Sequence, residues 1–356
     1  MEDLFIHITV TTAIQVIVLG FIGGVLSGFI GSGGAFFMTP GMMNLGVQGV
    51  IAVGSNISHK FGKALVGSRK HGELGHVDKK LGIFMLITAL IGIRLAVWIS
   101  TSLFGVSDTH GAKGAAADLY ISVVFVVILL GVGISVLADV LRSRSNEDAG
   151  PSRKITNYLS KLRLFPMIYF PVADVRVSLW VLLIVGLLTG YLAGTIGVGG
   201  FIGVPAMIYV FGIPTAVATG TELFLAVFMG AFGAINYAFE GFVDIRLVLL
   251  LYLGSLVGIF VGAYGTKVVN EVIIRLVTGI IIILCVISRM IAIPIYLSQL
   301  DIVHLVSPES LPVLNDISKY FLYLSGLSGV LVILVQVIRG YIRRRRVYAT
   351  IVTRPK

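Results

Sequence analysis

Eight runs of mostly apolar residues recur along this chain of 356 residues. They are 13 to 26 residues long, around the length of about 20 residues that an α-helix needs to cross a bilayer. Charged residues make up only 12% of the chain, against roughly 25% in soluble domains. We therefore predict an all-α integral membrane protein, with the lipid bilayer as one partner. The predicted apolar runs are Ile14–Ile30, Leu81–Phe104, Leu119–Leu141, Leu179–Tyr191, Leu223–Phe239, Leu247–Val261, Val272–Leu297 and Phe321–Val337.

Two glycine-rich stretches reveal an internal repeat. The stretch GFIGSGGAFFMTP begins at Gly28, and GTIGVGGFIGVP begins at Gly194, 166 positions later. The same offset relates the motif GHVD, ending at Asp78, to GFVD, ending at Asp244. This register predicts two copies of one transmembrane unit. We place the first copy at 1–141, a basic linker at 142–177, the second copy at 178–300, an extracytoplasmic loop and last transmembrane helix at 301–342, and a basic tail at 343–356.

The basic residues predict how the two copies lie in the membrane. They concentrate in 60–80, in the linker and in the RRRR motif that begins at Arg343, and basic loops favour the cytoplasmic side. All three basic segments lie on the cytoplasmic side only if, in each copy, the glycine stretch and the apolar segment after it together make a single crossing of the membrane. We therefore predict inverted-topology repeats in the cytoplasmic membrane, with the N-terminus outside and the C-terminus inside. The linker is either an amphipathic helix on the inner leaflet or an unstructured basic segment.

Glycine is unfavourable inside a helix, so its density in the two stretches needs a reason. Glycines allow a broken or re-entrant helix, which is tolerated at membrane depth where protein or water satisfies the freed backbone groups. The exposed N–H groups can then bind an anion. Close helix packing is the alternative, and we favour it for Gly20, Gly24 and Gly28. The candidate anion-binding residues are Gly31, Ser32, Gly33, Gly34, Gly197, Gly199 and Gly200.

A polar stripe follows the first glycine stretch. Its members are spaced three, four and seven residues from Asn56 and so share one face of a helix, which predicts that they line a cavity. The two lysines could instead extend to the cytoplasmic interface. In the second copy, Glu222 is a candidate for coupling transport to protons, or else a structural carboxylate. The candidate substrate-binding residues of these segments are Ser55, Asn56, His59, Lys60, Lys63, Thr221 and Asn236.

One further charge lies within an apolar run. Arg94 is either a functional intramembrane arginine or a side chain that reaches the outer interface. The six histidines show no HExxH motif or other metal-binding spacing, so we expect no enzyme, no metal and no cofactor. Positive-inside bias accounts for the net charge of +10 without a nucleic-acid partner.

At its paired glycine stretches, each followed by a small-residue segment (AVGSN, 52–56, and ATGTE, 218–222), the sequence resembles the TauE/SafE family of sulfite exporters and sulfonate permeases. The resemblance covers about 14–290. It implies a secondary transporter of small sulfur-containing anions, such as sulfite or organosulfonates, driven by protons or membrane potential. An anion channel, or a transporter of other small carboxylates or oxyanions, is the alternative. The oligomeric state stays open, with a homodimer as one option.

Overall fold

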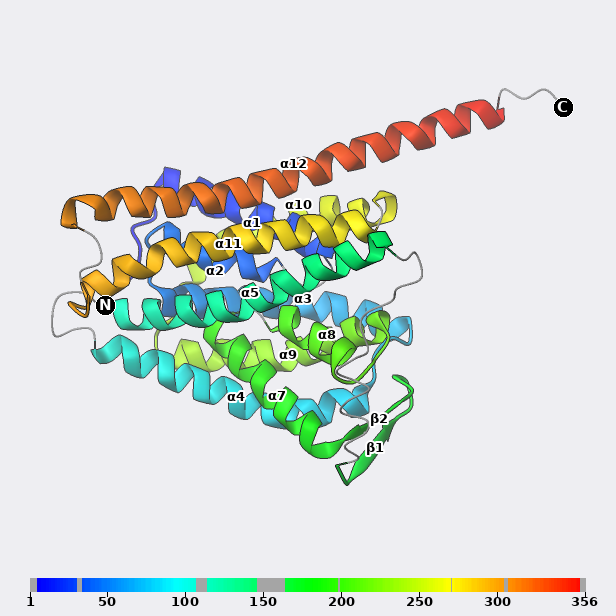
Figure 1. The fold of residues 1–356 in the computed structure, drawn as a ribbon, viewed down its shortest axis with the longest axis horizontal. Coiled ribbons are helices and arrows are strands. Elements are labelled where there is room, and N and C mark those ends of the chain that lie inside the picture. The colour runs from blue at the N-terminus through cyan, green and yellow to red at the C-terminus, as the bar shows by residue number, and fades with distance from the viewer. Residues whose placement is uncertain are drawn as a thin grey trace.

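The computed structural model describes residues 5–30, 34–106, 114–145, 164–197, 199–269, 271–303 and 307–352, and this part of the chain is almost entirely helical. Eight of its helices are long and apolar enough to cross a membrane, and each contains one of the predicted apolar runs. The chain is therefore an all-α, multi-pass membrane protein. The helices, shown in Figure 1, are α1 (Val10–Ile30), α2 (Ala35–Asn44), α3 (Gly49–Glu73), α4 (Lys79–Val106), α5 (Ala115–Ser145), α7 (Leu179–Ile196), α8 (Gly200–Tyr209), α9 (Thr215–Phe239), α10 (Ile245–Val268), α11 (Glu271–Gln299) and α12 (Leu311–Val352), with a 3₁₀ turn at Pro308–Ser310.

Close contacts between helices fix the direction in which each one runs. Gly20 and Gly28 of α1 lie against Leu251 and Ile259 of α10, so α1 and α10 are parallel. By the same type of contact, α4 is parallel to α7, whereas α3 is antiparallel to α9 and α5 is antiparallel to α11. End A denotes the end of the bundle at which α1 and α3 begin. End B denotes the opposite end. Helices α7 and α9 run from end B to end A, against the direction of α1 and α3.

Each glycine stretch separates a long helix from a short one that doubles back. Gly34 lies against Gly23 and Gly41 lies against Leu19, so α2 returns along α1 toward end A. In the second half, Gly203 lies against Thr189, so α8 returns along α7 toward end B. Each short helix has 10 residues, or about 15 Å, which is about half of the hydrocarbon thickness. The glycine-broken, re-entrant helices predicted from the sequence are therefore present.

The glycines at the ends of the long helices are needed for packing. A Cβ atom on Gly24 would lie 2.5 Å from the carbonyl oxygen of Ser255, and one on Gly190 would lie 2.0 Å from that of Ala89. No side chain fits at such distances, so α1 approaches α10, and α7 approaches α4, through bare backbone. Close packing was the expectation for Gly20, Gly24 and Gly28, and these contacts confirm it.

The repeated aspartates join the two halves. The backbone N–H of Asp78 donates a hydrogen bond of 3.0 Å to the Thr221 hydroxyl, and that of Asp244 donates one of 3.1 Å to the Ser55 hydroxyl. These four residues form two pairs related by the repeat offset. Each aspartate also begins a helix, since the carboxylate of Asp78 accepts from the N–H of Leu81 and that of Asp244 accepts from the N–H of Arg246. The relation of the halves as inverted repeats, with opposite placement in a bilayer, stays a prediction.

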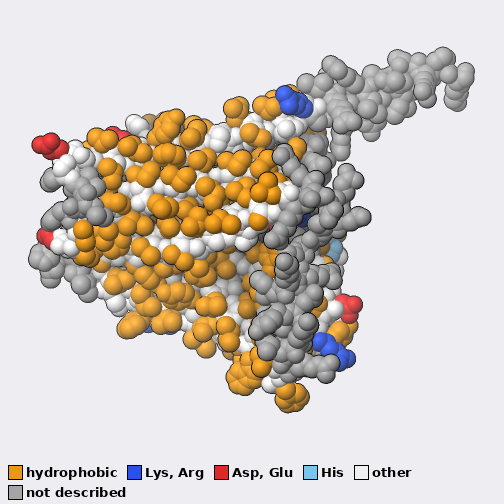
Figure 2. Space-filling model, viewed as in Figure 1, with side chains coloured by type: hydrophobic (Ala, Val, Ile, Leu, Met, Phe, Trp, Pro, Cys, Tyr) orange, Lys and Arg blue, Asp and Glu red, His pale blue; other side chains and the backbone are white. Residues whose placement is uncertain are grey.

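The surface agrees with a lipid environment. Figure 2 shows one face of the bundle as a broad hydrophobic band, with the described charged side chains gathered toward the two ends. Large exposed apolar side chains such as Trp98, Val127 and Phe260 lie on the membrane-spanning helices. Contact with hydrocarbon removes the cost that this exposure would have in water.

Two segments have secondary structure that the sequence did not predict. The linker ends in a short antiparallel hairpin, β1 (Met167–Phe170) and β2 (Val175–Ser178), which the sequence analysis missed. Its turn is held by the Asp78 carboxylate, which accepts from the N–H groups of Val172 and Ala173. Helix α12 continues to Val352, into the segment expected to be a tail. The possible amphipathic helix of the linker falls mostly on 146–163, outside the described residues.

Candidate functional site

The two breaks meet in the interior of the bundle, at the side chain of Asn56. Its amide donates hydrogen bonds of 2.9 Å to the carbonyl oxygen of Ala35 and 2.8 Å to the hydroxyl of Thr39. Thr39 in turn donates to the carbonyl oxygen of Ile196, at the end of α7. The next residue, Gly197, has a left-handed φ of 75° that favours glycine. One buried chain of hydrogen bonds therefore links the start of α2 to the end of α7.

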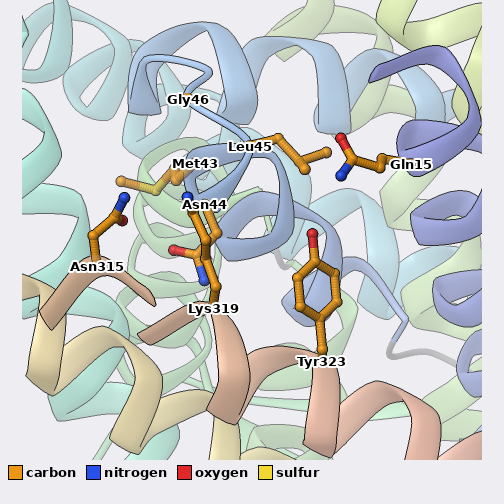
Figure 3. A pocket seen from close by; sticks show the side chains of 8 residues that line it. All are labelled: Gln15, Met43, Asn44, Leu45, Gly46, Asn315, Lys319 and Tyr323. Carbon is orange, nitrogen blue, oxygen red and sulfur yellow. The ribbon is translucent and has the colours of Figure 1, made fainter. Parts of the chain in front are cut away.

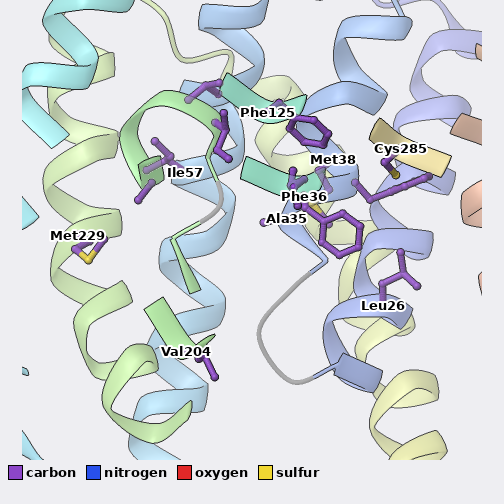
Figure 4. Packing of buried hydrophobic residues seen from close by; sticks show 14 of the residues in the cluster. Leu26, Ala35, Phe36, Met38, Ile57, Phe125, Val204, Met229 and Cys285 are labelled. Atoms are coloured by element: carbon purple, nitrogen blue, oxygen red, sulfur yellow. The ribbon is translucent and has the colours of Figure 1, made fainter. Parts of the chain in front are cut away.

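A narrow cavity of about 10 Å³ lies beside this junction, between α3, α4, α7 and α9. Figure 4 shows two of its apolar wall residues, Ile57 and Met229, to one side of the buried α2 side chains Ala35 and Phe36. The volume corresponds to about one water molecule. A larger solute could enter only if these walls moved apart. The residues lining this cavity, which we call the central cavity, are Ile57, Lys60, Ile93, Ala193, Gly197, Gly199, Ala226, Met229 and Gly230.

Lys60 supplies positive charge to the central cavity. Its Nζ lies 2.9 Å from the position that a Cβ atom on Gly199 would take. Gly199 directly precedes α8, and Gly200 is the first residue of that helix. The start of a helix carries a partial positive charge from its unpaired N–H groups. Lysine and helix terminus together therefore favour an anion at this point.

Glu222 lies closer to end B than Lys60 does, and only 1% of it is exposed. Neither of its carboxylate oxygens has a hydrogen-bond partner among the described residues. Glu222 lies against Gly203 and Lys60 lies against Gly199, about one turn apart along α8, but no ion pair between these two described side chains is found. A Cβ atom on Gly203 would lie 2.2 Å from Oε2, so the backbone of α8 rests directly on the carboxylate. A buried carboxyl with free oxygens can exchange a proton.

The other residues of the polar stripe have different surroundings. The Nε2 atom of His59 lies 2.7 Å from the hydroxyl of Ser255, and its ring packs on that of Tyr252, so the side chain faces α10 and not the central cavity. Lys63 is one turn further along α3 than Lys60 and does not line the cavity. Of this stripe, only Lys60 lines the cavity in the described structure.

Several candidate residues lie away from the central cavity. Ser55 and Thr221 use their hydroxyls to hold Asp244 and Asp78, as described above. Arg94 donates a hydrogen bond of 3.1 Å to Asn236 and lies 3.6 Å from Glu240, with 55% of its side chain exposed. This geometry corresponds to the alternative in which Arg94 reaches an interface.

The glycine candidates divide in a similar way. Gly31, Ser32 and Gly33 lie outside the described residues. A Cβ atom on Gly34 would lie 1.7 Å from the carbonyl oxygen of Gly23, so Gly34 is required where α2 crosses α1. Gly197 and Gly199 line the central cavity.

Sequence reasoning missed three residues here. Thr39 lies inside the first glycine stretch, and its position one residue before Pro40 gave no signal of a link to α7. Gly203 was not singled out, although it too belongs to the second stretch. Arg289 is 1% exposed in α11 and meets the criterion that selected Arg94, an arginine within an apolar run. Within the described ranges, no group of His, Cys, Asp and Glu side chains could hold a metal ion.

Comparison with known proteins places the chain in a family. A family model described as "Sulfite exporter TauE/SafE" matches residues 16–289. The chain is 26% identical to "Probable membrane transporter protein YjnA" of Bacillus subtilis (strain 168), over 71% of this chain and 89% of that protein. It is 24% identical to "Probable membrane transporter protein YdhB" of the same organism, over 73% of this chain and 93% of that protein. No solved structure matches the chain. The chain therefore belongs to the TauE/SafE family and is a multi-pass membrane transporter.

Proposed function

We propose that the protein is a secondary transporter, not an enzyme, that moves small sulfur-containing anions such as sulfite or organosulfonates through the central cavity. The observation that carries this proposal is the position of Lys60 beside Gly199, where α8 begins. A tetrahedral or pyramidal oxyanion can accept hydrogen bonds from an ammonium group and from backbone N–H groups at one point. The description of the matching family supports sulfite as the anion.

The transport cycle follows from an inverted-repeat arrangement, which is part of the proposal. Helices α2 and α8 start near the middle of the bundle and run to opposite ends. Rocking of one half against the other would open the central cavity to each side in turn. We place the protein in the cytoplasmic membrane, with end A outside and end B in the cytoplasm. Helix α12 carries the RRRR segment toward end B, and basic segments favour the cytoplasmic side.

Glu222 couples the cycle to protons in this proposal. An ionised Glu222 would neutralise Lys60 and compete with the substrate anion, whereas a protonated one would leave Lys60 free to bind it. One proton would then accompany the anion in each cycle. Glu222 suits this role because its oxygens have no hydrogen-bond partner among the described residues that would fix their state.

The test uses the full chain in proteoliposomes, with radiolabelled methanesulfonate as substrate because its own charge does not change near neutral pH. A pH gradient across the membrane should alter the initial rate of flux in the unaltered protein. Glu222→Gln should still transport down a substrate gradient but lose the response to the pH gradient, whereas Glu222→Asp should keep it. Glu240→Gln is the matched control, because Glu240 directly follows α9 with 40% of its side chain exposed. An unchanged pH response in Glu222→Gln would show that Glu222 is structural.

A further inference from the structure

A second cavity, of about 340 Å³, lies at end A between α1, the turn after α2, and α12. Figure 3 shows its polar side chains: Gln15 of α1, Asn44 at the end of α2, and Asn315, Lys319 and Tyr323 of α12. We call it the end-A cavity, and it shares no lining residue with the central cavity. The family match ends at residue 289, so the contribution of α12 lies outside the matched region.

The cavity side of α12 carries a regular polar stripe. Asn315, Lys319 and Tyr323 are spaced four residues apart and therefore share one face of the helix. This face lies within the part of α12 that could span a membrane, Leu311–Gln336. A lysine in such a segment is costly in contact with lipid and usually faces a polar cavity. Lys319 lines the end-A cavity with 35% of its side chain exposed.

The charge of Lys319 is only weakly neutralised. Its Nζ is 3.7 Å from Asp316, whose side chain is 78% exposed, and exposed pairs of this kind contribute little. A second cation lies behind the cavity wall, because the guanidinium of Arg289 donates to the Asn44 side chain.

We propose that the end-A cavity binds a small oxyanion group, a sulfonate, sulfite or phosphate. Lys319 supplies the charge, and the hydroxyl of Tyr323 with the side-chain amides of Gln15 and Asn315 supplies hydrogen-bond donors. The volume, about 340 Å³, is within the range of small-molecule sites. The oxyanion group belongs either to a free solute or to the headgroup of an anionic lipid, since α1 and α12 both could span a membrane and carry exposed apolar side chains such as Ile14 and Leu327.

The test measures methanesulfonate binding to the purified full chain by calorimetry, in a Lys60→Met background that weakens the central cavity. One class of binding site should remain in this parent protein. Adding Lys319→Met should weaken that binding by about tenfold to a hundredfold, the effect of losing a charged hydrogen bond. Tyr323→Phe should weaken it severalfold and serves as the milder variant. Asp316→Asn should strengthen binding, because the competing carboxylate is removed.

Lys79→Met is the matched control, because Lys79 is an exposed lysine at end B and should not affect binding. Nanodiscs of phosphatidylcholine, with or without phosphatidylglycerol, separate the two sources of the oxyanion. Competition by phosphatidylglycerol that disappears in Lys319→Met identifies a lipid headgroup, and equal affinity in both lipids identifies a free solute. The proposal is overturned if the Lys60→Met parent binds no methanesulfonate, or if Lys319→Met and Tyr323→Phe both bind it as the parent does. Either result leaves the test of the central cavity by flux unaffected.

Discussion

Replacing Lys60 by methionine tests the central cavity most directly. Methionine keeps most of the length and apolar contact of the lysine side chain but removes its charge and its three donors. Lys60 is the only charged residue among the described residues that line this cavity, so no neighbour there can substitute for it. A charge-assisted hydrogen bond contributes about 1.5–3 kcal/mol, and each 1.4 kcal/mol corresponds to about a tenfold change in affinity. We therefore expect Lys60→Met to weaken binding at the central cavity by about 10-fold to 100-fold.

The assay is equilibrium binding of radiolabelled methanesulfonate to protein that also carries Lys319→Met, so that the end-A cavity contributes little. Salt concentration is held constant, because bulk ions screen charge. Lys63→Met is the control: it removes the same charge one turn away, from a residue that does not line the cavity, and it should weaken binding much less. If Lys60→Met binds within twofold of its parent while eluting as a folded, monodisperse protein, Lys60 does not bind the anion.

Three further predictions concern the scaffold. Gly190→Val should destabilise the protein by about 1–3 kcal/mol or more, because its Cβ would lie 2.0 Å from a carbonyl oxygen of α4. Thermal unfolding measures this effect. The control, Gly131→Val, has open space around the new side chain and should unfold near the temperature of the parent protein. Thr221→Val should lower the thermal unfolding midpoint, since the buried N–H of Asp78 loses its acceptor at a cost of about 1–3 kcal/mol; an unchanged midpoint would show that water replaces the hydroxyl. Arg94→Gln should change methanesulfonate flux in proteoliposomes by less than about twofold, because its exposed pair contributes little. A large loss of flux would instead support a functional role for Arg94.

The membrane-spanning helices were predictable because hydrocarbon imposes one strong rule. Every backbone polar group must be paired within the segment, so long apolar runs become helices. All eight predicted runs therefore lie inside helices that could span a membrane. The re-entrant segments were predictable as breaks, because a dense cluster of glycines weakens a continuous helix at the depth where a helix is otherwise required.

The contacts between distant segments were not predictable from a single sequence. Two examples are the hydrogen bond from Thr39 to the end of α7 and the contact of Gly203 with Glu222. Both depend on how the two halves pack together and not on the local sequence pattern. The hairpin of β1 and β2 was missed because its strands have only four residues each, and its turn is held by Asp78, which is far away in sequence. Short strands of this kind give little periodic signal.

The candidate site itself shows how repetition and divergence combine. Asn56 and Glu222 occupy the same position in the two copies, by the repeat offset of the glycine stretches. The amide of Asn56 donates to Ala35 and Thr39 and so fixes the start of α2. Glu222 is equally buried, yet its oxygens bond no described residue, and α8 only rests against it. The Asn56 amide thus has a structural role in one copy, whereas the carboxylate oxygens of Glu222 in the other copy have no hydrogen-bond partner among the described residues. An unpaired buried carboxyl is costly to keep, and this cost is explained if its protonation has a role in transport.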